Sequence, residues 1–297
     1  MVPGHRAPKF AFIAAIGLVL ALASLSPAAA ATCDRACLKG MIDRYVDAVV
    51  AHDASKLPLA ANVRVTENSQ DVKIGDGMDK TVTGKAGFRQ DYLDTAKGIA
   101  ASHMVLLEGK NQLLYSVLLH VRDGRIAGVE TLVQRITPDS RFQPTEFGGP
   151  IRGMNDPIPP GKRETRAAMI RIALGYPEGL RIGDFTQGGT RFASETYRVE
   201  NGVITAGVGC KRPGCGMYEQ KIMKHPDVKA NVAAVDEENG VVLLWMNFGD
   251  TNSYGPGNAL VTFEAFKVWG GQIHAVNAFF PILPVATQRG WPASDPQ

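Results

Sequence analysis

One pattern occurs twice in this sequence, and it limits the folds that the chain can adopt. Residues 112–133 read QLLYSVLLHVRDGRIAGVETLV, and residues 259–280 read ALVTFEAFKVWGGQIHAVNAFF. Each copy has an apolar strand, a short turn closing on glycine and a second strand, which is the pattern of a β-hairpin. Upstream, residues 64–69 (RVTENS) correspond to residues 197–202 (YRVENG). Two matched signals at similar spacing predict a duplicated domain.

Residues 1–31 are predicted to form a secretory signal peptide. Arg6 and Lys9 precede an uncharged apolar run of about 16 residues, and small residues that suit a signal peptidase follow it. A membrane-spanning helix needs roughly 20 apolar residues, so an anchor is disfavoured. Lipid attachment at Cys33 is the rival interpretation, although Thr32 is bulkier than such a site prefers. We expect a periplasmic or secreted protein without a membrane anchor after cleavage.

The remaining chain of about 266 residues suits two domains of about 100 to 130 residues. We expect the first domain at 33–136 and the second at 163–291. Residues 137–162 contain six prolines, which remove backbone donors and predict a linker. The composition is that of a globular protein, and no basic run with interleaved aromatic residues indicates a nucleic-acid partner.

The first domain is expected to open with a helix over residues 34–52, because its apolar residues recur at helical spacing and Asp34 can cap it. Further helices are expected at residues 88–95, 163–174 and 217–223. The main strands are expected at residues 103–107, 112–121, 125–135, 231–235, 241–248, 259–268 and 272–281. Helices with strand meanders form an α+β pattern, with helices on one face of a bent antiparallel sheet.

The four cysteines fall into two local pairs, Cys33 with Cys37 and Cys210 with Cys215. A structural disulfide between Cys210 and Cys215 is favoured over metal binding, because no histidine lies close to either pair in sequence. Cys33 and Cys37 stand one helical turn apart, which is a difficult but feasible geometry. Cross-pairing between the two halves stays open.

Several segments carry a recognisable pattern: the strand ending in Thr66-Glu67-Asn68, the meander closing on residues 124–130 (GRIAGVE), and residues 57–60, 235–240, 283–284 and 290–291. In these segments the chain resembles the SnoaL-like branch of the nuclear transport factor 2-like superfamily. The resemblance covers about residues 33–291 and is to an exported, tandem type from bacteria and fungi. It implies two tandem cone-shaped α+β half-barrels, each around an apolar pocket. The superfamily includes isomerases, cyclases, lyases, hydrolases and non-catalytic binders, so fold alone selects no reaction.

Enzymes of this fold place a few polar groups on the inner face of the bent sheet, where burial shifts their pKa values. The polar residues that interrupt apolar strands are His103, His120, Glu130, Glu264, His274 and Asn277. The alternative for each is a place on a solvated sheet face. Two Glu-Asn pairs, Glu67-Asn68 and Glu200-Asn201, could line the pocket mouth or could serve as turn residues.

The second domain is expected to carry the site, because it has more aromatic residues and a glycine-rich loop at 251–258 that Asp250 introduces. His274 is the first candidate for a general base, followed by Asn277 and Asp250. The candidates from the first domain are His103, Glu67 and Glu130. His274 and Asn277 point to opposite faces of a regular strand, so a β-bulge would be needed for both to face the pocket.

No nucleotide-binding, metal-binding or serine-nucleophile motif occurs in the sequence, so we expect no cofactor and no metal. The sequence favours a cofactor-independent hydrolase or lyase that acts on a small hydrophobic aromatic compound. Cleavage of a lignin-derived aryl ether is the most specific hypothesis, resting on the resemblance and on export. The alternatives are a non-catalytic protein that binds an apolar ligand and a SnoaL-like isomerase or cyclase. Two domains in one chain suggest a monomer with an internal pseudo-dimer.

Overall fold

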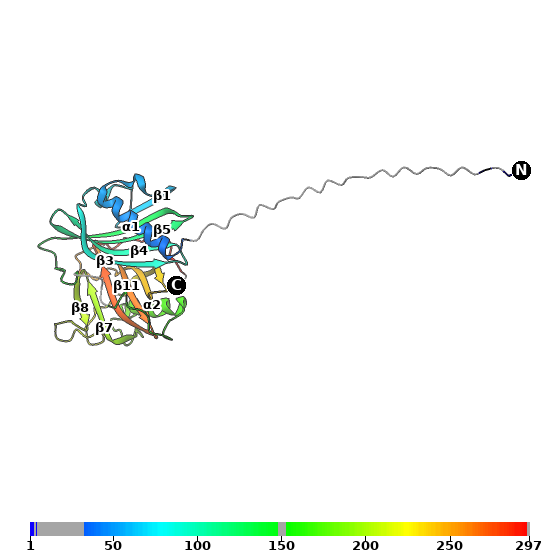
Figure 1. Ribbon diagram of the computed structural model, residues 1–297. Helices are drawn as coiled ribbons and strands as arrows, with labels where there is room; N and C mark the ends of the chain where they lie inside the picture. The colour runs from blue at the N-terminus through cyan, green and yellow to red at the C-terminus, as the bar shows by residue number, and fades with distance from the viewer. Residues whose placement is uncertain (3, 5–32, 148–152, 296–297) are drawn as a thin grey trace. The chain divides into compact units, whose positions relative to one another are not determined.

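The computed structural model describes residues 33–147 and 153–295, together with Met1, Val2 and Gly4. The predicted signal peptide lies almost entirely outside the described residues. Each repeat contains one long helix that packs on its own sheet (Figure 1). The first repeat consists of α1 (Arg35–Ala51), η1 (Ala54–Lys56), β1 (Leu59–Glu67), β2 (Gln70–Val72), η2 (Gly77–Lys80), β3 (Gly84–Asp94), β4 (Ile99–Glu108), β5 (Asn111–Arg122) and β6 (Arg125–Ile136).

The second repeat begins after a segment without helix or strand among its described residues. It consists of α2 (Arg166–Ile182), β7 (Phe192–Glu200), β8 (Val203–Gly207), β9 (Lys229–Asp236), β10 (Val241–Asn247), β11 (Asn258–Trp269), β12 (Gln272–Phe279) and β13 (Ile282–Pro284). Both helices begin at a side-chain cap: Asp34 accepts from the Cys37 amide, and Thr165 accepts from the Ala168 amide.

The two sheets have the same topology. Their strand orders are β2-β1-β6-β5-β4-β3 and β8-β7-β12-β11-β10-β9, with β13 paired to β11 outside this path. In each sheet the strand after the long helix runs parallel to the last long strand, β1 with β6 and β7 with β12. The prediction of two tandem α+β half-barrels formed by internal duplication is therefore confirmed.

Two of the expected short helices are wrong. Residues 88–95 belong mostly to β3, where Phe88, Gln90 and Tyr92 are buried while Arg89 and Asp91 are less so. This two-residue alternation is that of a strand, and pairing with β4 overrides the local sequence preference. Residues 217–219 form a turn after β8, and residues 220–223 form neither helix nor strand.

Apolar side chains form three layers. One cluster lies between α1 and the first sheet, and a second lies between α2 and the second sheet. The third lies between the two sheets and combines residues such as Tyr92 and Leu118 with Trp245 and Phe263. Alternate residues of a strand serve different layers: Phe263 faces the other sheet, whereas Phe266 faces α2.

Reciprocal ion pairs join the repeats. Arg35 at the start of α1 binds Asp236 at the end of β9, with Nη1 to Oδ1 at 2.8 Å. Arg166 at the start of α2 binds Asp94 at the end of β3, with Nη2 to Oδ2 at 2.6 Å. Asp236 also accepts from the Leu93 amide, and Asp94 accepts from the Val235 amide. These matched contacts relate the repeats as the two subunits of a twofold dimer are related.

Both cysteine pairs form local disulfides, Cys33 with Cys37 and Cys210 with Cys215. This confirms the local pairing and excludes cross-pairing between the halves. Disulfides are typical of an oxidising, extracytoplasmic compartment. Among the described residues, no helix is long and apolar enough to cross a membrane.

Candidate functional site

A cavity of about 720 Å³ lies at one end of the second repeat. We call it the mouth cavity. Its walls come from the C-terminal part of α2, from β7 and β8, from the disulfide loop 208–215, and from segments around Phe142, His225 and Tyr254. The loop leaves β8 at Gly207, whose φ is +75° and where an added Cβ would lie 2.0 Å from the Thr196 carbonyl oxygen. Only glycine allows this close passage, so the turn that starts the loop depends on it.

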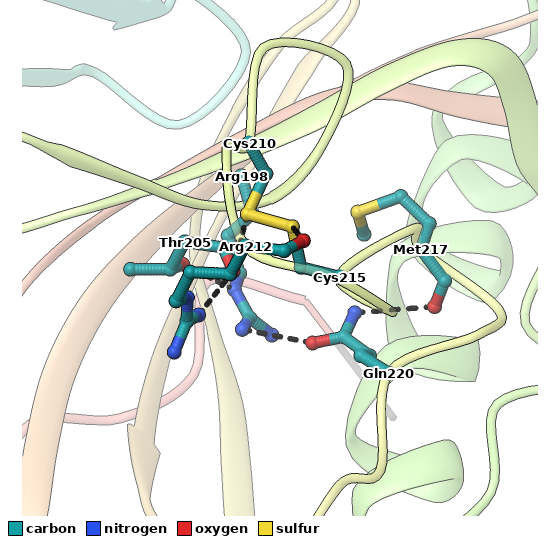
Figure 2. The surroundings of a disulfide bond; sticks show 7 residues. All are labelled: Arg198, Thr205, Cys210, Arg212, Cys215, Met217 and Gln220. Atoms are coloured by element: carbon teal, nitrogen blue, oxygen red, sulfur yellow. Dashed lines mark hydrogen bonds between the residues drawn. A yellow bond between two sulfur atoms is a disulfide. The ribbon is translucent and has the colours of Figure 1, made fainter.

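Arg198 of β7 is the central polar residue of the mouth cavity. Its side chain is held from three sides: Nε donates to Thr205 Oγ1 (3.0 Å), Nη1 to the Tyr176 hydroxyl (2.9 Å) and Nη2 to Gln220 Oε1 (3.0 Å). Gln220 is itself fixed by donating to the Met217 carbonyl (Figure 2). Glu200 Oε1 lies 3.5 Å from Arg198 Nε and also lines the cavity. The guanidinium is therefore fixed in place at the cavity wall.

Glu264 of β11 is 1% exposed and interacts with the side chains of Glu200, Arg198 and Tyr176. Burial raises its pKa to about 8, and the nearby Glu200 carboxylate adds to the increase, while Arg198 and the Tyr176 hydroxyl oppose it. Its Oε1 has no hydrogen-bond partner among the described residues. At neutral pH Glu264 is therefore mostly protonated, so it can donate a proton or a hydrogen bond.

The first repeat lacks this polar network. Strand register makes Val65 equivalent to Arg198, since they pair with Val129 and Val276 at matching places in β6 and β12. By the same comparison, Val117 is equivalent to Glu264. The Tyr45 hydroxyl of α1 bonds to the Tyr115 hydroxyl instead (3.0 Å). The cation and the buried carboxyl thus occur at these positions in the second repeat alone.

Tyr254 and His225 complete the mouth cavity. Tyr254 belongs to the glycine-rich loop, and its pKa is raised to about 12 by burial and by Glu200. His225 Nδ1 lies 3.0 Å from the Phe248 carbonyl oxygen, and burial lowers the pKa of its imidazole. Both side chains are therefore neutral at pH 7. Tyr254 can donate a hydrogen bond to an oxygen of a bound molecule.

His103 and Asn277 are brought together, but not at a cavity. His103 is on β4 and Asn277 is on β12, and Asn277 Nδ2 lies 2.9 Å from His103 Nδ1. The Tyr92 hydroxyl lies 3.1 Å from the same nitrogen. Both side chains are fully buried between the sheets, and burial lowers the His103 pKa to about 3, partly offset by the Phe263 backbone. In this geometry His103 is a neutral partner in a buried polar contact.

His274 lies at a β-bulge of β12, where pairing with both β11 and β7 skips it. Its Nδ1 lies 2.6 Å from Glu195 Oε1 and its Nε2 lies 3.0 Å from the Trp269 carbonyl oxygen. The imidazole also stacks on the Trp269 ring at 3.4 Å. Both nitrogens are thus engaged within the protein, away from the mouth cavity.

The remaining predicted residues lie apart from one another. Asp250 is exposed, and its Oδ1 accepts from the Asn252 amide in a local turn. Glu67 Oε2 accepts from the Met78 amide. Glu130 forms a buried two-bond pair with Arg289, at 2.8 and 2.9 Å. The catalytic roles of Asp250, Glu67 and Glu130 remain predictions.

The sequence left two interpretations of the Glu-Asn pairs open, turn residues or residues at the pocket mouth, and the structure contains examples of both. Asn68 and Asn201 have positive φ values of 49° and 44° and sit in the turns that follow β1 and β7. The side-chain oxygen of Asn68 accepts from the Val133 amide in β6, and that of Asn201 accepts from the Phe280 amide just after β12. Glu200, in contrast, lines the mouth cavity.

Arg198 and Tyr176 were not among the predicted site residues. The echo between residues 64–69 and 197–202 contained a usable signal, because Arg198 stands where the first copy has apolar Val65. Glu264 was visible as a charge within an apolar strand. Among the described residues, no group of three or more histidine, cysteine, aspartate or glutamate side chains could hold a metal ion.

Comparisons with known proteins place the chain in a family. A search of the curated proteins found no match. Among solved structures, the chain is similar to a protein from Kribbella flavida DSM 17836 that carries the provisional name ketosteroid isomerase; the match covers 39% of this chain and 97% of that one, at 19% identity and a TM-score of 0.30. The family model described as a domain of unknown function, DUF8021, matches residues 31–133 and 162–280. Because that match spans both repeats, the chain belongs to the DUF8021 family.

Proposed function

We propose that the second repeat is a cofactor-independent acid-base catalyst that acts on a small hydrophobic, aromatic compound in the mouth cavity. The observation that carries this proposal is Glu264, a buried carboxyl whose pKa is raised to about 8. The Tyr176 hydroxyl bonds to Glu264 and accepts from Arg198, which lines the cavity. Shifted carboxyl groups beside a cavity are typical of proton-transfer sites.

Each group has a distinct role in this proposal. Glu200 faces the cavity and removes a proton from the substrate. Because Glu264 is mostly neutral at pH 7, Glu200 is the nearby carboxylate that offsets the Arg198 charge. Once Glu200 has taken up the proton, the Arg198 charge is no longer offset and stabilises negative charge that develops on a substrate oxygen. Tyr254 donates a hydrogen bond to that oxygen. Glu264 acts indirectly. Because it is mostly protonated at pH 7, it does not add a second negative charge near Arg198.

The most specific reaction is eliminative cleavage of a lignin-derived aryl ether. Glu200 would take a proton from the carbon next to the ether-bearing carbon, a carbon–carbon double bond would form, and the bond to the ether oxygen would break. The aryloxide leaves with that electron pair, held by the hydrogen bond from Tyr254, and the proton that Glu200 removed passes to it directly or through water, which regenerates the Glu200 carboxylate. Export of the protein, which the two disulfides favour, would bring it to such environmental compounds.

Incubation of the purified protein with a panel of aryl ether dimers and enolisable aromatic ketones tests the proposal. The buffer contains a chelator and no nucleotide, and D2O reports proton abstraction as deuterium incorporation by mass spectrometry. Glu200→Gln should lower turnover by about a hundredfold or more, the usual effect of losing a general base. Glu146→Gln, an exposed control, should retain full turnover. Full turnover in a folded Glu200→Gln variant would refute the proposed role of Glu200.

A non-catalytic ligand-binding function is the second candidate. It is favoured by the fact that Glu264 is 1% exposed and does not itself line the mouth cavity. The same panel separates the two candidates. Thermal stabilisation by a compound that is neither converted nor exchanged with deuterium would support the binding protein, whereas product formation would support the enzyme.

A further inference from the structure

The mouth cavity carries a local excess of positive charge. The whole chain is nearly balanced, with 32 lysines and arginines against 29 aspartates and glutamates. The cavity is lined by four basic side chains and by one acidic side chain, that of Glu200; the basic residues are Arg141, Arg198, Arg212 and Lys221. In the part of the chain that the structure describes, no carboxylate lies within ion-pair distance of Arg141, Arg212 or Lys221, whereas Glu200 lies close to Arg198.

The disulfide loop places Arg212 at this cavity. Its Nη2 donates to the Thr205 carbonyl oxygen at 2.7 Å, close to the Arg198 side chain (Figure 2). The backbone that carries Arg212 is held by the Cys210–Cys215 bond, and the Gly207 amide donates to the Cys215 carbonyl oxygen at 2.7 Å. Arg212 is therefore anchored on one side while the rest of its guanidinium is available for a ligand.

Arg198 offers a second, more rigid donor set. It is 9% exposed, and three of its five N–H groups are used by Thr205, Tyr176 and Gln220. A buried guanidinium in a fixed position matches the geometry of a carboxylate, which can accept two parallel hydrogen bonds. The aromatic ring of Phe142 and that of Tyr254 line the same cavity and provide a surface for an apolar group.

We propose that the substrate is an aromatic organic acid whose carboxylate binds Arg212 and Arg198 at the disulfide loop, with its ring against Phe142 and Tyr254. This inference rests on the proposed function, since it names the substrate class of the same site. It also gives the disulfide a role: the bond holds Arg212 where it can contact the anion. The first repeat has a valine at the position of Arg198 and would lack this selectivity.

Isothermal titration calorimetry with the full protein tests the inference independently of turnover. The probes are 3-phenylpropanoate, its amide and phenyl phosphate at low ionic strength. We expect the carboxylate to bind at least tenfold more tightly than the amide. Equal affinity for carboxylate and amide would overturn the inference, while turnover of neutral ethers in the panel above would leave the catalytic proposal intact. Tighter binding of phenyl phosphate than of the carboxylate would also overturn it, because it would identify a phosphate site.

Matched variants locate the contact. Arg212→Gln should weaken carboxylate binding by about tenfold, since one charged hydrogen-bond donor is lost. Lys211→Gln, its exposed neighbour outside the cavity lining, should leave the affinity unchanged. Cys210→Ser with Cys215→Ser should weaken binding to a similar extent, whereas removing the Cys33–Cys37 bond should not. Unchanged affinity in Arg212→Gln would overturn the assignment to the disulfide loop.

Discussion

The ionisation of Glu264 should make the stability of the protein fall as the pH rises. Burial raises the pKa of this carboxyl from 4.5 to about 8 in the folded protein. Between these two pH values the folded state holds a proton that the unfolded chain releases. The stabilisation is therefore complete below about pH 4.5 and is lost as the pH rises through about 8.

The size of the effect follows from the pKa interval. From 4.5 to about 8, at about 1.4 kcal/mol per pH unit, the upper limit is about 5 kcal/mol. Glu264 is 1% exposed, so bulk water screens it little. Glu264→Gln keeps the shape and neutrality of the protonated side chain and removes the ionisation. The free energy of unfolding of the variant, relative to wild type, should thus increase by up to about 1.4 kcal/mol for each pH unit between pH 5 and 8.

Urea denaturation followed by tryptophan fluorescence measures this difference, with Trp245 as a buried reporter. Wild type and Glu264→Gln are compared at pH 5, 6, 7 and 8 in buffers of equal ionic strength. Glu219→Gln, which replaces an exposed carboxylate, should give a curve parallel to wild type. If the curve of Glu264→Gln is also parallel to wild type, Glu264 does not hold a proton at neutral pH, and its role in the proposed catalysis fails with that result.

Three further predictions concern the ion pairs, the bulged histidine and the network of the second repeat. Asp94→Asn and Asp236→Asn should each lower the free energy of unfolding by about 3 kcal/mol in urea denaturation, because each removes the charge of a fully buried carboxylate that binds an arginine and a backbone amide of the other repeat. A loss below about 1 kcal/mol in both would refute this. His274→Ala should retain turnover within about threefold in the ether assay, since both ring nitrogens bind within the protein; a hundredfold loss would restore His274 as the base. The double variant Arg198→Val with Glu264→Val has the residues of the first repeat at both positions. Differential scanning calorimetry should show a melting temperature at least equal to that of wild type, and titration calorimetry should show no carboxylate binding. Retained binding would contradict the proposed contact.

The duplication could be predicted because its signal is local. Both hairpins close on glycine within two or three residues, and alternate strand positions are apolar in each copy. Asn68 and Asn201 occupy corresponding turns, one in each repeat. Both have a positive φ, a backbone conformation that few residues other than glycine and asparagine adopt readily. Signals of this kind depend on neighbours in sequence, so the sequence alone specifies them.

The strand β3 could not be predicted for the opposite reason. Phe88 and Tyr92 stand four residues apart, a spacing that also fits one face of a helix. Gln90, which lies between them, is 1% exposed, and its side-chain amide donates to Asn155 Oδ1 in the segment before α2. A glutamine in the sequence gives no sign that its side chain will be buried unless its hydrogen-bond partner is known. That partner, Asn155, is 65 residues away.

The candidate site shows the same limit. His103 and Asn277 were assigned to separate domains, yet they are in contact across 174 residues of sequence. Which face of β12 meets the other sheet depends on the bulge at His274, and a bulge has no reliable sequence signal. Arg198 and Glu264 likewise come close enough to interact electrostatically only through the order of strands in the second sheet.

The layer between the sheets and the layer under each helix have diverged in different ways. Glu130 and Asn277 occupy equivalent positions between the sheets, and both are polar, with partners in Arg289 and His103. A polar side chain between the sheets contacts the other half of the chain, as Asn277 contacts His103 and Glu130 contacts Arg289. Replacing it therefore affects both repeats. Under the helices each repeat packs on its own sheet, and valines in the first repeat correspond to Arg198 and Glu264 in the second. A change in that layer leaves the other repeat intact. Duplication therefore let one helix-side layer become polar while the shared layer kept both repeats together.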